Sequence, residues 1–188
     1  MGKPYLYFFE SEFVTKLIRT DRYRGFKFKN CFRFIDDACS LNDSEEFEKS
    51  HHEIYPKELI LKSEHKGQHA TFLDLDITIK DSIFVYKLFD KRDAFPFFIV
   101  RMSDLSGNIP HHVFYGSVLS ETLRIARASL LYDDFLSKTK TLFLRMVKQG
   151  ASLDRLMIVV RKVFQKHSEA FSSFEKTIIE IISDLTTI

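Results

Sequence analysis

The sequence predicts an α+β protein, in which two antiparallel hairpins with packing helices precede a bundle of helices. Short runs of alternating apolar side chains occur before residue 110, whereas the three-and-four spacing of helices dominates from residue 113 onward. The chain has 188 residues, of which 45% are hydrophobic, so it can bury the core of one ordinary domain or of two small ones. It contains 20 Phe but only 6 Gly and 4 Pro, which argues against disorder.

The first predicted element is a helix over residues 5–19. Pro4 stands at its start, where a missing N–H costs nothing. The apolar side chains that would form one buried face of this helix are Leu6, Phe9, Phe13 and Leu17.

Residues 26–42 are predicted to form a hairpin whose tip carries two adjacent acids, Asp36 and Asp37. Strand-forming residues precede this pair, and a second short apolar run follows it. A tight turn accommodates Asp easily, so a polar turn without chemistry is one interpretation. The other is a site for a hard divalent cation, Mg²⁺ or Mn²⁺, which prefers oxygen ligands and can organise phosphoryl transfer.

A helix is predicted over residues 43–55, with Asp43 as its N-cap, and a strand over residues 58–62. His51 and His52 fall inside this helix. Because adjacent helical side chains point about 100° apart, a surface role is favoured over a shared metal.

The second predicted hairpin joins a strand over residues 72–80 to a strand over residues 83–90 through a turn at residues 81–82. Asp74 and Asp76 would share one face of its first strand and form a rival carboxylate pair. A solvated strand face is the favoured interpretation of that pair.

Four helices are predicted after this hairpin, with boundaries at residues 113–131, 133–149, 153–167 and 174–185. Gly150 is expected to end the second of them, and Ser172 with Glu175 fits a capping box for the last. Basic side chains are spread over the outside of this predicted bundle.

Charge is unevenly distributed along the chain. Residues 34–81 hold 12 acids and 5 basic residues. By contrast, residues 1–33 hold 3 acids and 8 basic residues, and residues 113–169 hold 5 acids and 10 basic residues. An acidic middle between two basic segments suits a protein that collects metal ions centrally and holds a phosphate backbone on either side. Ordinary solvated helix faces are the alternative interpretation.

The sequence shows no run of 18 apolar residues and no convincing signal peptide. We therefore expect an intracellular protein, in the nucleus or the cytoplasm, with no membrane partner.

The four residues Phe34-Ile35-Asp36-Asp37 resemble the aromatic-x-Asp-Asp signature of the reverse transcriptase palm, its metal-binding motif C. The order of the later pieces is more specific than any one of them. Together, over about residues 1–171, they resemble the C-terminal half of the reverse transcriptases of mobile elements such as retrotransposons, closest to the Penelope-like type. These later pieces are Ile54-Tyr55-Pro56, Glu58-Leu59, Phe72-Leu73-Asp74-Leu75, the run from Lys87 to Asp93, and Asn108-Ile109-Pro110.

This resemblance implies a partial palm over residues 1–110 and a helical, thumb-like bundle over residues 111–188. It also implies metal-dependent nucleotidyl transfer by an RNA-directed DNA polymerase, with Asp36 as the principal metal ligand and Asp37 as its neighbour. Phe34 replaces the Tyr more often seen in this signature, which removes a hydroxyl but keeps the aromatic ring.

The resemblance further implies an RNA template and a DNA primer as partners. The hairpin after the catalytic one holds the primer end in related enzymes, which makes Lys87, Lys91 and Arg92 candidates for phosphate contacts. An ordinary charged turn is the alternative. Candidates on the predicted bundle are Arg124, Arg127, Lys138 and Lys140.

In the family, a third metal-binding Asp and the fingers lie upstream of the segment matched here, so Met1 is expected to be an internal residue of a longer polymerase. We expect the 188-residue chain to be inactive alone and to need the missing N-terminal half as a partner. The alternative class is a non-catalytic remnant that binds nucleic acid or protein through its basic helices.

Overall fold

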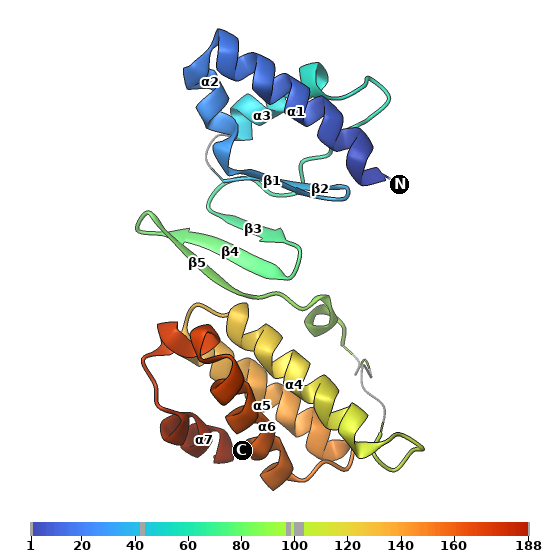
Figure 1. The fold of residues 1–188 in the computed structure, drawn as a ribbon, viewed down its shortest axis with the longest axis vertical. Coiled ribbons are helices and arrows are strands. Elements are labelled where there is room, and N and C mark those ends of the chain that lie inside the picture. Colours follow the sequence, from blue (N-terminus) through green and yellow to red (C-terminus); the bar gives the residue numbers. More distant parts are fainter. Residues whose placement is uncertain (1, 42–43, 97–98, 100–103, 188) are drawn as a thin grey trace. The chain divides into compact units, whose positions relative to one another are not determined.

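The computed structural model describes residues 2–41, 44–96, 99 and 104–187, with the backbone alone for residues 2–5, 44 and 94. The fold is mixed α and β, as predicted (Figure 1). The chain divides into two compact units, residues 1–73 and residues 74–188. The expected boundary between residues 110 and 111 lies inside the second unit, at the start of helix α4, and the division into palm and thumb stays a prediction.

Unit 1 contains the first predicted helix and the first predicted hairpin. The hairpin is shorter than expected, because residues 26–30 are helical; the Asp21 side chain caps α2 by accepting a hydrogen bond of 3.0 Å from the Arg24 amide. The elements of unit 1 are α1 (Gly2–Thr20), α2 (Arg22–Lys27), the 3₁₀ helix η1 (Phe28–Asn30), β1 (Cys31–Phe34), β2 (Asp37–Ser40), α3 (Ser44–Ile54) and β3 (His69–Phe72).

One predicted strand is wrong, and another begins later than predicted. Residues 59–66 form neither helix nor strand, and Ile60 is 82% exposed, so a weak alternation without a paired neighbour did not produce a strand. The strand expected over residues 72–80 is interrupted at Leu73, which has a φ of 57°, and at Asp74. The predicted N-cap Asp43 lies outside the described residues.

Unit 2 begins with the second predicted hairpin, which is confirmed. Strand β4 (Leu75–Lys80) pairs antiparallel with β5 (Ile83–Leu88), and both turn residues, Asp81 and Ser82, have positive φ. The rest of unit 2 consists of the 3₁₀ helix η2 (Lys91–Ala94), α4 (His111–Arg127), α5 (Tyr132–Lys148), α6 (Leu153–Lys166), the 3₁₀ helix η3 (Ser168–Phe174) and α7 (Ile178–Thr186).

The core of unit 2 lies among its helices. Helices α4, α5 and α6 run side by side, and α7 packs on α5 and α6 (Figure 1). Phe135 is fully buried, and its ring contacts Phe171 and Phe174 at centroid distances of 5.6 and 5.1 Å. Leu88 of β5 joins the same cluster and thereby fixes the hairpin to the helices. No helix in the described ranges is both long and apolar enough to cross a membrane.

The ends of the predicted helices agree with the structure at one position and differ at another. Gly150 has a φ of 88° and follows α5, as predicted. The capping box predicted at Ser172 and Glu175 is wrong, because the box is formed by Thr177 and Glu180 and α7 starts at residue 178. Both sequence windows have the required spacing, but only the second leads directly into an apolar run.

Replacing Phe135 by Ala should lower the free energy of unfolding by about 3–5 kcal/mol, because a fully buried ring would leave a cavity among two other Phe rings. Urea denaturation followed by circular dichroism would measure this. Leu144→Ala on the same helix is the control, since Leu144 is 47% exposed and its truncation should cost about 0.5 kcal/mol or less. Equal losses in the two variants would contradict the assigned core.

Candidate functional site

The β1–β2 hairpin has a two-residue loop made of Ile35 and Asp36, because Phe34 is paired directly with Asp37. Ile35 has a φ of 56°, a left-handed conformation that a β-branched side chain disfavours strongly. Such a residue costs about 1–3 kcal/mol and persists only where its surroundings hold it in place. The loop is therefore a strained element.

Arg33 holds this loop in place. Its Nη1 donates a hydrogen bond of 2.9 Å to the carbonyl oxygen of Ile35, and its Nε pairs with the Glu10 carboxylate at 2.5 Å. The hydroxyl of Tyr55 donates to the same Glu10 oxygen at 2.6 Å. These contacts join β1 to α1 and to the residue that follows α3.

Tyr55 is the buried end of this group, with 8% of its surface exposed. Burial raises the pKa of its phenol well above the usual value, and its hydrogen bond to Glu10 raises the pKa further. The phenol therefore stays protonated and remains a donor throughout the physiological pH range.

Asp36 and Asp37 are both exposed at the tip of the hairpin. Residues paired across strands share a face, so Asp37 lies on the same face as its partner Phe34. Phe32, two residues earlier in β1, belongs to that face as well, and the two Phe residues are 50% and 46% exposed. The carboxylates thus adjoin an open aromatic surface.

The donor set fits a divalent cation that takes only part of its ligands from the protein. Within the described ranges, no three His, Cys, Asp or Glu side chains come together as a metal-binding group. Mg²⁺ commonly binds through one or two carboxylates and completes its octahedron with water and phosphate oxygens. Asp36 and Asp37 can supply those two carboxylates.

The rival pair Asp74 and Asp76 does not share a strand face, contrary to the prediction. Asp74 lies in the turn before β4, where its carboxylate pairs with Arg124 at 2.8 Å. Asp76 lies in β4 and pairs with Lys87 at 3.8 Å. Each carboxylate is therefore compensated by a different cation.

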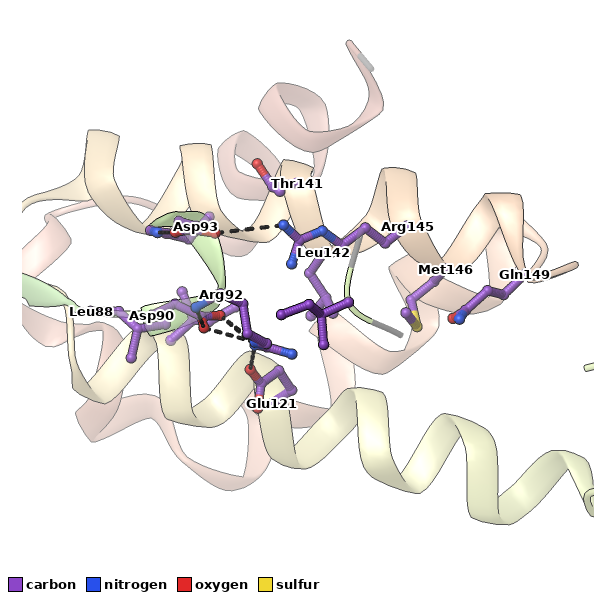
Figure 2. A pocket seen from close by; sticks show the side chains of 13 residues that line it. Leu88, Asp90, Arg92, Asp93, Glu121, Thr141, Leu142, Arg145, Met146 and Gln149 are labelled. Carbon is purple, nitrogen blue, oxygen red and sulfur yellow. Dashed lines mark hydrogen bonds and ion pairs between the residues drawn. The ribbon is translucent and has the colours of Figure 1, made fainter. Parts of the chain in front are cut away.

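The predicted phosphate contact Arg92 is held by an acid two residues away. Its Nε donates to both oxygens of Asp90, at 2.7 and 3.0 Å, and its Nη2 lies 4.0 Å from Glu121 (Figure 2). The hydrogen bonds from Arg92 lower the pKa of Asp90 to about 2. This guanidinium is thus part of the internal charge network of unit 2.

Most of the other predicted cations also have internal partners. Arg124 donates to Glu121 at 2.7 Å in addition to Asp74, and Arg127 pairs with Glu169 at 3.2 Å. The remaining pairs and contacts are Lys87 with Asp76, Lys138 with Asp93, and Lys140 with the hydroxyl of Thr187. Lys91 is exposed, and no carboxylate partner for it is found within the described ranges. Their role as phosphate ligands stays a prediction.

A small pocket of about 40 Å³ lies between η2, α4 and α5 in unit 2 (Figure 2). Its lining contains three acidic side chains and three basic ones, so the charges balance. The acids are Asp90, Asp93 and Glu121, and the bases are Arg92, Lys138 and Arg145. Ligand pockets for drug-sized molecules measure about 300–1,000 Å³, so this one suits a few water molecules and no nucleotide.

Sequence reasoning did not find the acids of this network or Glu10 at the hairpin. Asp90 and Asp93 flank Lys91 and Arg92, so their spacing is a usable signal for local pairing. Glu10 lies 23 residues before Arg33, and no local pattern indicates that contact.

No protein-family model, no curated protein and no solved structure matches this chain. Its function is therefore inferred from the hairpin and from the distribution of charge described above.

Replacing Ile35 by Gly should slow amide hydrogen exchange in β1 and β2 by about fivefold, equivalent to about 1 kcal/mol, because Gly adopts positive φ without strain. Ile60→Gly is the control and should not slow exchange, because Ile60 is 82% exposed and does not have a positive φ. Faster exchange in the Ile35 variant would contradict the assigned strain.

The Asp90–Arg92 pair predicts a specific pH dependence of stability. Because the pKa of Asp90 is lower in the folded state than its usual 3.8, the pair stabilises the fold above about pH 4 and loses this effect as the pH falls toward 2. Asp90→Asn should cost about 1–2 kcal/mol at pH 7, after allowance for solvent screening, and almost nothing at pH 2. Urea denaturation across this range would measure it, and Asp81→Asn in an exposed turn should keep the wild-type profile.

Proposed function

We propose that this chain is the C-terminal part of an RNA-directed DNA polymerase of the mobile-element type. In this proposal Asp36 is the principal ligand of a catalytic Mg²⁺ or Mn²⁺, and Asp37 is its neighbour. The observation that carries the proposal is a pair of exposed carboxylates, Asp36 in a strained hairpin loop and Asp37 beside it at the start of β2, with Arg33 hydrogen-bonded to the loop carbonyl. The order of the sequence motifs gives further support.

The strain at Ile35 supports a functional loop over a polar turn without chemistry. A structural turn has no need for a β-branched residue at positive φ, where Gly or Asn would be favoured. Strained backbone concentrates at active sites, where the position of a side chain matters more than its local energy. The contact from Arg33 to the loop carbonyl is the kind of support that such a position needs.

The proposed reaction is the attack of a primer 3′ oxygen on the α-phosphate of a nucleotide. When bound, two metal ions supply stabilisation of the attacking and leaving oxygens. In this reaction the chain would hold the carboxylates of Asp36 and Asp37 next to each other at the hairpin tip. It would also offer the exposed rings of Phe32 and Phe34 as flat apolar surfaces for base stacking.

The proposal assigns the other parts of the chain by the same resemblance. The β4–β5 hairpin would correspond to the primer-holding hairpin, and the helices of unit 2 to the thumb. An RNA template and a DNA primer would be the nucleic-acid partners, and a polypeptide equivalent to the N-terminal half would supply a third carboxylate.

The proposal predicts that Mn²⁺ binds the chain and that Asp36→Asn weakens this binding by at least about tenfold, because a carboxylate ligand would be lost. Isothermal titration with MnCl₂ would measure the affinity. Asp81→Asn is a matched control, because Asp81 is an exposed acid in the turn of the other hairpin and should bind no metal.

Equal Mn²⁺ affinity in wild type and Asp36→Asn would overturn the proposed metal site. The alternative, a non-catalytic remnant that binds nucleic acid or protein, would then be the better account of the chain.

A further inference from the structure

Helix α6 carries a stripe of basic side chains on its exposed face, which we call the α6 stripe: Arg155, Arg161, Lys162 and Lys166. The opposite face is buried in the core of unit 2 through Leu156, Val160 and Val163. At 100° per residue, Arg155, Lys162 and Lys166 lie within about 40° of one another, whereas Arg161 lies about 100° from Lys162, at the other edge of the exposed half of the helix. Three of the cations therefore form one row along the helix, and Arg161 lies on the same exposed half.

This stripe differs in its partners from the cations that lie between the second hairpin and the helices of unit 2. Arg92, Arg124 and Lys138 each pair with a carboxylate, as described above. By contrast, no salt bridge forms at Arg161, Lys162 or Lys166 within the part of the chain that the structure describes.

The acids nearest to the ends of the stripe do not neutralise it. Glu169, just after α6, is engaged by Arg127 at 3.2 Å and by His167 at 3.5 Å. Asp154 is exposed in the first turn of α6, at the opposite end from Lys166. The Arg155 guanidinium contacts the His111 ring nitrogen at 3.0 Å and the Tyr115 ring, which leaves its charge uncompensated.

We propose that the α6 stripe binds the phosphate backbone of a double-stranded nucleic acid. From Arg155 to Lys166 the helix rises by about 16 Å, at 1.5 Å per residue. Phosphates follow one another at about 3.4 Å of helix axis on each strand, so the stripe is long enough to contact several of them. Uncompensated Lys and Arg side chains gain most from such contacts, because no internal ion pair has to break.

A membrane surface fits these observations less well. A helix that binds lipid needs an apolar face that enters the bilayer. The apolar face of α6 is buried in the protein core, and Ile158 is the large apolar residue that its exposed side offers. The stripe can therefore bind a ligand almost only through electrostatic contacts.

This inference deepens the proposed function, since it names where the duplex would lie, but it requires no metal. Its test is fluorescence anisotropy with a labelled RNA–DNA duplex of about 20 base pairs and the full chain, in EDTA. The triple variant Arg161→Gln, Lys162→Gln, Lys166→Gln should bind at least about tenfold more weakly. The slope of log K against log salt should also become shallower by about two to three, because about 0.9 is lost per phosphate contact.

The matched control is Lys57→Gln, Lys62→Gln, Lys80→Gln, which removes the same charge from three exposed positions outside α6. It should weaken binding by less than about threefold. Equal losses in the two triple variants, or no binding by the wild type, would overturn the inference. Binding to phosphatidylserine vesicles that is lost in the α6 variant, without duplex binding, would assign the stripe to membranes instead.

The Asp36→Asn variant separates this inference from the proposed metal site. Duplex binding should be unchanged in that variant, since the assay contains no divalent cation. A chain that binds the duplex through α6 but shows no Asp36-dependent Mn²⁺ binding would support the inference and refute the metal site. The opposite pair of results would refute the inference alone.

Discussion

The arrangement of the first hairpin depends on the side chain of Arg33. One guanidinium donates to the carbonyl oxygen of Ile35 and to Glu10, and Glu10 also accepts the Tyr55 hydroxyl. Hydrogen bonds to charged groups contribute about 1.5–3 kcal/mol each, which is comparable to the cost of about 1–3 kcal/mol for a β-branched residue at positive φ. The loop that carries Asp36 can therefore remain strained without weakening the unit as a whole.

The two units are stabilised by different interactions. Among its described residues, unit 1 buries few apolar side chains, namely Leu17, Ile54 and Tyr55, and it relies on polar contacts such as that of Arg24 with Ser50 at 2.9 Å. Unit 2 buries a large apolar cluster, and its ion pairs lie at the margin of that cluster. Since local opening is easiest where few apolar contacts are lost, the hairpin of unit 1 should open more readily than the helices of unit 2.

Sequence patterns predicted the local features of this chain better than the contacts between them. The acids at the first hairpin and the helix end at Gly150 follow from turn chemistry within a few residues. The contact of Arg33 with Glu10 and that of Arg124 with Asp74 join residues 23 and 50 positions apart, and no local spacing encodes them. The break at Leu73 was missed for a related reason, since neither Gly nor Pro marks that turn.

The charges between the second hairpin and the helices of unit 2 alternate in sign along one path. Asp74, Arg124, Glu121, Arg92 and Asp90 follow each other from the turn before β4, across α4, to the segment after β5. Apolar contacts such as that of Leu88 are non-directional and would tolerate sliding by one residue. A slip of the hairpin by one residue would place Leu73 or Leu75 at Arg124 in place of Asp74 and break that pair, so these ion pairs favour a single docking orientation of the hairpin, whatever their net effect on stability.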